Sequence, residues 1–299
     1  MAIPESQLET WSHQGSITQS KNTYATIKTA LEETDSSYAG KSFEVFLQGS
    51  YGNDTNIYGE SDVDVVIRLD SIMRSDLSKL PEEQKNAYHK AYATATYTFD
   101  EFKQGVINQL IASFGKRDVV AGNKAVKIKA NGSRRNADVV ICYQYRRYIS
   151  FNNTKDQKYV PGIIFPTSTS GEIINYPKKH SENCTTNHQA TGAMYKPMVR
   201  ILKNMRSLMV EEGMLLDGVA PSYYLEGLFY NVPAEQYVTS SYGDTFCNGI
   251  NWLLEANRKK KLVCANRQYW LLGNSNVQWN EADFDTFLSA ACKLWREWE

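Results

Sequence analysis

The stretch that decides the fold runs from Phe43 to Leu69 and reads FEVFLQGSYGNDTNIYGESDVDVVIRL. Two short apolar runs, rich in β-branched and aromatic residues, flank a segment rich in glycine and asparagine. Such runs predict two adjacent strands of one sheet. The segment between them, with Gly49-Ser50 and then Gly52-Asn53-Asp54, predicts a turn that presents backbone N–H groups.

Two aspartates, Asp62 and Asp64, open the second apolar run. Residues two apart on a strand point to the same face, so we expect both side chains to project together. Carboxylates held this close repel each other unless a cation or a shared proton compensates. A phosphate-friendly turn beside two such acids predicts a metal–triphosphate site, whereas the simpler alternative is a solvated acidic strand end.

A third acid, Asp138, begins a later apolar run, ADVVICYQY, in the same position that Asp64 has in its own run. Three carboxylates from two adjacent strands can hold two Mg²⁺ ions, or Mn²⁺, which take oxygen ligands and share them with substrate phosphates. Two such ions would align a hydroxyl with an α-phosphate for in-line displacement. Gly49 would let the backbone approach a triphosphate, and the Ser50 hydroxyl would donate to it. The alternative for Asp138 is an acid at a strand edge.

Composition excludes several classes of function. The chain has 299 residues, and 33 Lys and Arg balance 33 Asp and Glu, so no global charge directs it to nucleic acid or membrane. The N-terminus, MAIPESQLETW, lacks a secretory signal, and no apolar run approaches the ~18 residues of a membrane span. Five cysteines without a CxxC pair fit a reducing compartment. We expect a cytoplasmic protein with no membrane partner and no strong nucleic-acid partner, and we expect a monomer.

The remaining patterns predict an α+β protein of two lobes. In the first 175 residues we expect a mixed sheet braced by an N-terminal helix, and in residues 176–299 a helical lobe. The helix over residues 5–36 should break near Gly15, and a second helix should start at Pro81 and continue to Phe114. Further strands are expected over residues 118–120, 125–129, 137–141 and within 159–174, and further helices over 191–212, 221–230, 234–260 and 280–298.

Taken together, these motifs resemble a known family. Gly-Ser, eleven residues, Asp-Val-Asp and a lone later Asp is similar to the pattern of the DNA polymerase β-like nucleotidyltransferases. The closest similarity is to the cyclic-oligonucleotide synthases, namely bacterial CD-NTases, cyclic GMP-AMP synthase and oligoadenylate synthase. The similarity continues through Tyr195-Lys196-Pro197-Met198-Val199-Arg200-Ile201-Leu202-Lys203 and the helix start Pro221-Ser222-Tyr223-Tyr224-Leu225-Glu226, and covers roughly residues 43 to 230.

The resemblance implies a polymerase β-like fold in which the helical lobe closes the nucleotide cleft. It also implies synthesis of a cyclic di- or trinucleotide from NTPs, with pyrophosphate release, in bacterial anti-phage (CBASS) signalling that activates a downstream effector. By motif position, Lys203 and Ser222 would bind triphosphate and Tyr223 would stack on a nucleobase. Asp138 would ligate the metal beside the attacking hydroxyl and take its proton. The other implied nucleotide-binding residues are Gln48, Gly49, Ser50, Lys196 and Arg200, and the implied ligands of two Mg²⁺ are Asp62, Asp64 and Asp138.

Two other functions are compatible with the sequence. One is a linear nucleotidyltransferase of the same superfamily that acts on RNA or protein. The other is a catalytically dead nucleotide sensor, which the presence of all three acids disfavours. The zinc-bearing insertion of the animal DNA-sensing relative is not recognisable, which argues against activation by DNA.

Two further patterns are more ordinary. His180, Cys184 and His188 have helical metal-ligand spacing, but a structural zinc site usually takes four ligands. We therefore favour a histidine that contacts nucleotide or caps a helix. The basic run from Arg258 to Lys261 is expected at a helix C-terminus, where cations are favourable. The pairs Arg134-Arg135 and Arg146-Arg147 fit either the pocket or an outer face.

Overall fold

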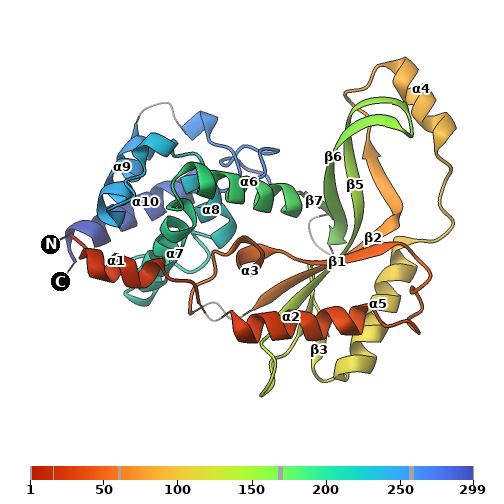
Figure 1. Ribbon diagram of the computed structural model, residues 1–299, viewed down its shortest axis with the longest axis horizontal. Helices are drawn as coiled ribbons and strands as arrows, with labels where there is room; N and C mark the ends of the chain where they lie inside the picture. The colour runs from red at the N-terminus through yellow and green to blue at the C-terminus, as the bar shows by residue number, and fades with distance from the viewer. Residues whose placement is uncertain (1, 16, 60–61, 168–170, 256–258, 299) are drawn as a thin grey trace. The chain divides into compact units, whose positions relative to one another are not determined.

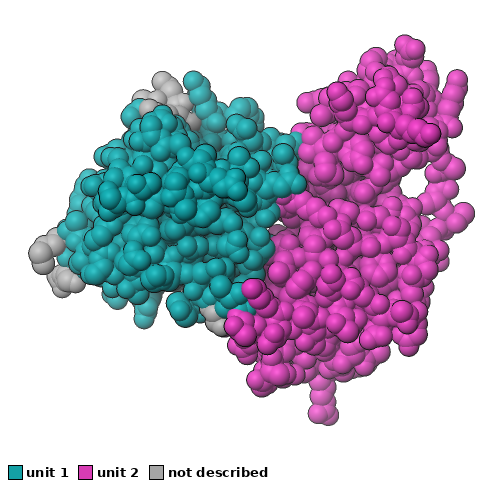
Figure 2. All heavy atoms as spheres, in the orientation of Figure 1, with its two compact units in different colours: residues 1–17, 49–60, 179–299 teal, residues 18–48, 61–178 magenta. Residues whose placement is uncertain are grey.

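The computed structural model describes residues 2–15, 17–59, 62–167, 171–255 and 259–298 (Figure 1). The chain forms two compact units (Figure 2). The sheet unit contains residues 18–48 and 61–178, and the helical unit contains residues 1–17, 49–60 and 179–299. A mixed sheet with helices is the predicted α+β class. The division differs from a single boundary at residue 175, because two N-terminal segments belong to the helical unit.

The sheet unit is built on a seven-stranded sheet in the order β1-β2-β5-β4-β3, with β6 paired to β5 and β7 paired to β6. Strands β2 and β5 run parallel, and the other pairs are antiparallel. The predicted pairing within residues 43–69 is confirmed, since Phe43 lies opposite Leu69. The strands are β1 Phe43–Leu47, β2 Val63–Asp76, β3 Val119–Ala121, β4 Val126–Ile128, β5 Ala137–Asn153, β6 Asp156–Thr167 and β7 Gly171–Asn175.

Three helices cover this sheet. Helices α2 (Thr18–Leu31) and α5 (Phe99–Phe114) pack against each other (Figure 1). Helix α2 also packs on β2, and α5 packs on β2 and β5. Helix α4 (Glu82–Ala91) packs on β5. The prediction of one helix from Pro81 to Phe114 is therefore wrong. The segment between α4 and α5 contains three threonines, and β-branched residues lose side-chain freedom in a helix. The last of them, Thr98, instead forms a capping box with Glu101 at the start of α5.

The helical unit is organised around α7, whose buried face contacts α1, α8, α9 and α10. The break predicted near Gly15 is confirmed, since α1 and α2 are separate helices. A side chain at Gly15 would collide with the Ile57 backbone, because a Cβ there would lie 2.5 Å from its oxygen. The helices of this unit are α1 Glu5–Ser12, α3 Gly49–Asn53, α6 Pro177–Ala190, α7 Tyr195–Glu211, α8 Ser222–Tyr230, α9 Tyr242–Leu254 and α10 Glu281–Arg296, with 3₁₀ turns at Ala234–Gln236 and Lys259–Lys261.

The predicted helix over residues 234–260 is shorter than expected. It divides into a 3₁₀ turn and α9, and the Ser241 side chain caps the start of α9. The helices predicted over residues 191–212, 221–230 and 280–298 are confirmed as α7, α8 and α10. Among the described residues, no helix is both long enough and apolar enough to cross a membrane.

Candidate active site

Two of the three predicted acids face each other in the sheet unit. Asp64 of β2 and Asp138 of β5 are direct partners in the parallel register. Partners on neighbouring strands point to the same face of a sheet, and their neighbours Val63, Val65 and Val139 are buried. Asp62 lies just before the first residue of β2. The predicted placement of the third acid on an adjacent strand is thus confirmed.

A lysine contacts this group of acids. The Nζ atom of Lys127 lies 3.3 Å from Asp62 Oδ2, and Lys127 is the register partner of Asp138 across β4 and β5. Burial and the charge of Asp62 raise the pKa of Asp138, while Lys127 lowers it. Burial is the largest of these effects, so the raised pKa reflects mainly the partly buried position of the Asp138 carboxyl group.

These residues fit a divalent cation of the Mg²⁺ type. All three offer carboxylate oxygens, the ligands that Mg²⁺ prefers, and a cation would relieve the repulsion by Asp62 that, after burial, raises the pKa of Asp138. The fit requires some rearrangement. Among the described residues, only His180, Cys184 and Glu226 have ligand atoms that all lie within 4.8 Å of one another. The carboxylate oxygens of the three aspartates are therefore more widely spaced. A cation would have to draw the three aspartate carboxylates together by side-chain rotation.

The predicted turn after β1 takes the form of a short helix. Residues 49–53 form the single-turn helix α3. Gly49 begins α3 with a φ of 65°, a left-handed conformation that favours glycine. Just before it, the backbone N–H of Gln48 donates to the Asp64 carbonyl at 3.0 Å and extends the pairing of β1 with β2. Gln48 therefore belongs to the sheet unit and Ser50 to the helical unit.

The three cations predicted from the α7 motif all contact the chain itself. Lys196 Nζ lies 2.9 Å from Asp54 Oδ2, and Arg200 Nη1 donates to the Asp54 carbonyl at 2.6 Å. Lys203 is fully buried, and its Nζ donates to the Thr55 carbonyl at 2.8 Å. These contacts fix the segment that begins at Gly49. Direct nucleotide binding by the three cations stays a prediction.

The Ser-Tyr motif starts α8 as predicted, with Pro221 at the N-cap. The Ser222 hydroxyl accepts a hydrogen bond from Arg206 at 3.1 Å. The Tyr223 ring stacks on the His180 imidazole, with centroids 4.9 Å apart and an angle of 26° between the rings. Its hydroxyl accepts from Asn266 Nδ2 at 2.8 Å. His180 therefore covers one face of the ring, and a base would have to stack on the other face.

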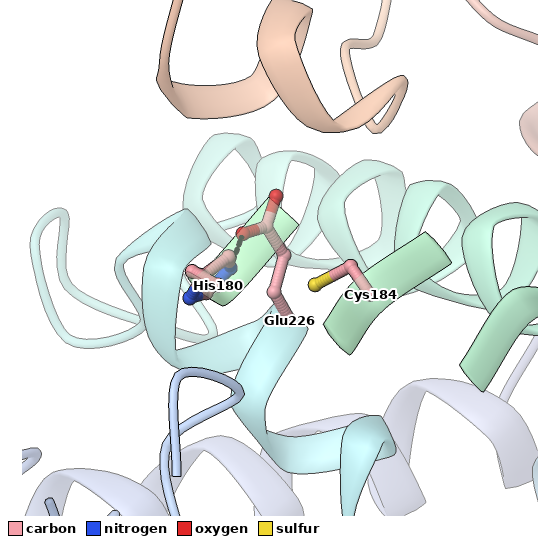
Figure 3. A group of neighbouring side chains, drawn as sticks. All are labelled: His180, Cys184 and Glu226. Atoms are coloured by element: carbon pink, nitrogen blue, oxygen red, sulfur yellow. Dashed lines mark hydrogen bonds and ion pairs between the residues drawn. The ribbon is translucent and has the colours of Figure 1, made fainter. Parts of the chain in front are cut away.

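Sequence reasoning did not single out Glu226 as a site residue. Its buried carboxylate accepts hydrogen bonds from Asn53, Thr55 and His180, the last at 2.6 Å (Figure 3). His180 and Glu226 also form an ion pair when the imidazole is protonated. A lone acid within the apolar run Leu225-Glu226-Gly227-Leu228-Phe229 was the available signal, since buried acids are rare unless they are paired.

The remaining sequence patterns have structural partners. His188 does not join His180 and Cys184, and its Nδ1 faces the Lys196 N–H at 3.4 Å. Burial lowers the pKa of His188, as do the nearby charges of α7. Arg258 lies outside the described residues, and Lys259 pairs with Asp285 of α10 at 2.5 Å rather than with the end of α9.

The arginine pairs are likewise accounted for. Arg134 is buried and pairs with Asp118 at 3.2 Å, while Arg146 donates to Gln144 at 2.7 Å and lies over the Tyr159 ring. Arg135 donates its backbone N–H to the Thr23 hydroxyl. These contacts support the fold of the sheet unit.

Comparison with known proteins identifies the family. Residues 182–296 match the model of the cGAS/DncV-like nucleotidyltransferase C-terminal helical domain. The chain is 37% identical to the cyclic nucleotide synthase CdnE01 of Staphylococcus haemolyticus, and the alignment covers 100% of both proteins. It is 40% identical to the cyclic UMP-AMP synthase of Rhodothermus marinus over 100% of this chain and 99% of that protein.

A solved structure shows the same relationship in three dimensions. The Rhodothermus marinus CdnE c-UMP-AMP synthase with Apcpp and Upnpp superposes with a TM-score of 0.88 at 40% identity, covering 99% of this chain and 97% of that chain. This chain and the Rhodothermus marinus synthase are therefore similar in both sequence and fold over essentially their whole length. The chain belongs to the cGAS/DncV-like nucleotidyltransferases, the CD-NTase family.

Proposed function

We propose that this nucleotidyltransferase joins nucleoside triphosphates into a cyclic di- or trinucleotide and releases pyrophosphate. The observation that carries the proposal is the register of Asp64 against Asp138, with Asp62 beside them, because this places three carboxylates at one edge of two parallel strands. The printed activities of the two close relatives, cyclic nucleotide and cyclic UMP-AMP synthesis, support the cyclic product.

The reaction needs a base and a means to neutralise phosphate charge. In each coupling, a ribose hydroxyl attacks an α-phosphorus, the bond to the β-phosphate oxygen breaks and pyrophosphate leaves. Asp138 would accept the hydroxyl proton, since a carboxylate within hydrogen-bond reach of a hydroxyl can act as its general base. Asp62, Asp64 and Asp138 would hold two Mg²⁺ ions, which supply Lewis-acid stabilisation of the phosphate oxygens.

The helical unit would bind and orient the nucleotide. The N–H groups that begin at Gly49 and the Ser50 hydroxyl would contact the triphosphate. Tyr223 would stack on a base, an interaction worth ~1–3 kcal/mol that tolerates any base because each has a π-face. Contacts of Lys196, Arg200 and Lys203 to residues 54 and 55 would keep this segment in place. A ring closes when the second hydroxyl attacks the first nucleotide in the same way.

We infer that the product acts as a second messenger on a nucleotide-activated effector in anti-phage defence. This role follows from membership of the family and from the cyclic product. A phosphodiester ring without terminal phosphates resists phosphatases, which suits a diffusible signal.

A product assay tests the proposal. The full chain is incubated with Mg²⁺ and labelled mixtures of the four NTPs, then with phosphatase, and the products are separated by chromatography. ATP with UTP is the first pair, because the Rhodothermus marinus relative joins these nucleotides. A phosphatase-resistant small product supports the proposal. Label transferred to RNA or protein would instead identify a linear transferase, and no pyrophosphate with Mg²⁺ or Mn²⁺ would identify a nucleotide sensor.

A further inference from the structure

The side chain of Glu226 connects three parts of the helical unit. It belongs to α8 and is 3% exposed. One carboxylate oxygen accepts from the Thr55 hydroxyl, and the other accepts from Asn53 Nδ2 at 3.1 Å and contacts His180 Nε2 at 2.6 Å. Asn53 and Thr55 belong to the segment that begins at Gly49, and His180 belongs to α6. Figure 3 shows the carboxylate directed at the imidazole.

The group of His180, Cys184 and Glu226 is better explained by hydrogen bonds than by a metal. Two ligands of one zinc ion at ~2.0–2.1 Å lie more than ~3 Å apart in tetrahedral geometry. The nitrogen–oxygen separation here is 2.6 Å, which is a hydrogen-bond distance. Cys184 Sγ is paired with the Tyr195 hydroxyl at 3.3 Å, and no fourth ligand completes the group among the described residues.

Buried charge accounts for the strength of this connection. The pKa of Glu226 is lowered, because contacts with His180 and the charge of Lys203 outweigh the effect of burial. Lys203 is itself fully buried and holds the Thr55 carbonyl. Thr55 is thus bound through its hydroxyl by an anion and through its carbonyl by a cation. Such charge-assisted bonds are roughly twice as strong as neutral ones, so this end of the segment is firmly held.

The same carboxylate is also connected, through His180, to the aromatic ring of the Ser-Tyr motif. Glu226 contacts His180, and the His180 ring stacks on Tyr223, three residues before Glu226 on α8. The Tyr195 hydroxyl donates to the Glu226 carbonyl at 2.8 Å and joins α7 to this turn of α8. One buried residue therefore links the proposed triphosphate segment to the proposed base-stacking ring.

We propose that Glu226 is a positioning residue for nucleotide binding, which acts through Thr55, Asn53 and His180 to hold the segment from Gly49 and the Tyr223 ring in one fixed arrangement. This inference rests on the function proposed above. Its ligand is a nucleoside triphosphate, whose phosphates and base these two features would contact. Preorganised groups bind more tightly, because less ordering is required at the moment of binding.

Variants at Thr55 separate this role from a general effect on folding. Thr55→Val removes the hydroxyl donor and leaves the contact of Glu226 with His180 in place, while Thr55→Ser keeps the hydroxyl. Thr245→Val is the matched control, since Thr245 is also fully buried in the helical unit and its hydroxyl bonds the Val238 and Ser241 backbone. Asn53→Ala removes a second donor to the same carboxylate and serves as an independent variant.

The measurements are calorimetric binding of a nonhydrolysable ATP analogue with Mg²⁺, steady-state kinetics and thermal unfolding. We expect Thr55→Val to weaken binding and raise the NTP KM by about tenfold, the effect of one hydrogen bond to a charged group, with kcat within about twofold of the wild type. Asn53→Ala should shift KM in the same direction. Thr55→Ser should bind like the wild type, and Thr245→Val should lose stability without a change in KM.

Three results would overturn the inference. The first is wild-type affinity in Thr55→Val and Asn53→Ala, and the second is an equal rise of KM in Thr245→Val. The third is one equivalent of zinc in purified wild-type protein that resists EDTA, which would make the group a metal site. These outcomes differ from failure of the proposed function, in which the wild-type protein itself would form no cyclic product.

Discussion

The two units treat buried and partly buried charge in opposite ways. In the sheet unit, Lys127 pairs with Asp62, and the pKa of Asp138 is raised by burial and by the charge of Asp62. In the helical unit, the pKa of Glu226 is lowered, because His180 and Lys203 outweigh the effect of burial. The charged form of Asp138 is thus disfavoured by burial and by a like charge, whereas the charged form of Glu226 is favoured by its partners.

This difference separates two tasks. Repulsion among acids is tolerated where a cation from solution is to be bound, since binding then relieves it. A network of paired buried charges is suited to fixing geometry, because each partner restricts the others and breaking one contact leaves a buried charge without its partner. Under the proposed function, the acids of the sheet unit would carry out the chemistry and the helical unit would position the nucleotide.

The largest expected effect tests the metal-binding role of the acids in the sheet unit. Asp64→Asn should lower product formation by ~10³-fold, because a metal ligand is lost and metal ions supply several kcal/mol of transition-state stabilisation. Binding of a nonhydrolysable ATP analogue should partly survive. Rates are measured by pyrophosphate release with saturating Mg²⁺.

Asp70→Asn is the matched control for Asp64→Asn. Asp70 lies on the same strand and pairs with Arg68 at 2.6 Å, away from the group of three acids. We expect its rate to stay within about threefold of the wild type. If Asp64→Asn were as active as Asp70→Asn, the metal assignment would be wrong.

The sequence predicts the sheet unit well because its signals are local. The two apolar runs within residues 43–69 identify two strands, and the equivalent starts of two apolar runs place Asp64 beside Asp138. The error in the same unit has a local cause too. Tyr88, Tyr92 and Tyr97 mimic helical spacing, yet Tyr92 already lies beyond the end of α4.

The helical unit is harder to predict because its contacts join distant residues. Asn53 and Thr55 are 173 and 171 positions from Glu226, so no periodicity within one segment reveals the contact. The motif Tyr195 to Lys203 identifies a functional helix, but the sequence does not show that its cations hold Asp54 and Thr55. The apolar face of α7 was predictable, whereas its polar partners depend on the tertiary fold.

A smaller expected effect concerns the helical unit, where the charge of His180 should make stability depend on pH. Burial alone would lower the pKa of His180, but Cys184 and Glu226 raise it to about 10. A raised pKa means that this contribution to stability is complete below the unfolded value of ~6.5 and is lost as the pH rises towards 10. The free energy of unfolding should therefore fall above pH 6.5, by up to about 1.4 kcal/mol per pH unit.

His180→Gln provides the comparison, since it keeps a donor but cannot titrate. Urea unfolding at pH 6, 7, 8 and 9 should show a shallower slope for this variant, and its deficit against the wild type should shrink as the pH rises. Parallel slopes would mean that a neutral imidazole bonds Glu226. That outcome would agree with the buried Nδ1 of His180, which has no hydrogen-bond partner.

The smallest expected effect concerns Lys127, which pairs with Asp62. Lys127 and Asp62 are both exposed enough for solvent to screen their pairing, so Lys127→Met should change stability by less than about 1 kcal/mol. Lys127→Met should have a more readily measured effect on metal binding. The positive charge of Lys127 partly offsets the negative charge of the acids that would bind a cation. Removing the lysine should therefore strengthen the attraction between these acids and a metal ion.

We therefore expect Lys127→Met to tighten Mn²⁺ binding by about threefold at low salt, measured by electron paramagnetic resonance titration of free Mn²⁺. The gain should shrink at 0.5 M salt, because the Debye length then falls to about 4 Å. Lys129→Met removes the same charge two residues away and should leave the affinity within error of the wild type. Weaker binding in Lys127→Met would mean that the lysine supports the metal site instead of competing with the metal for the acids.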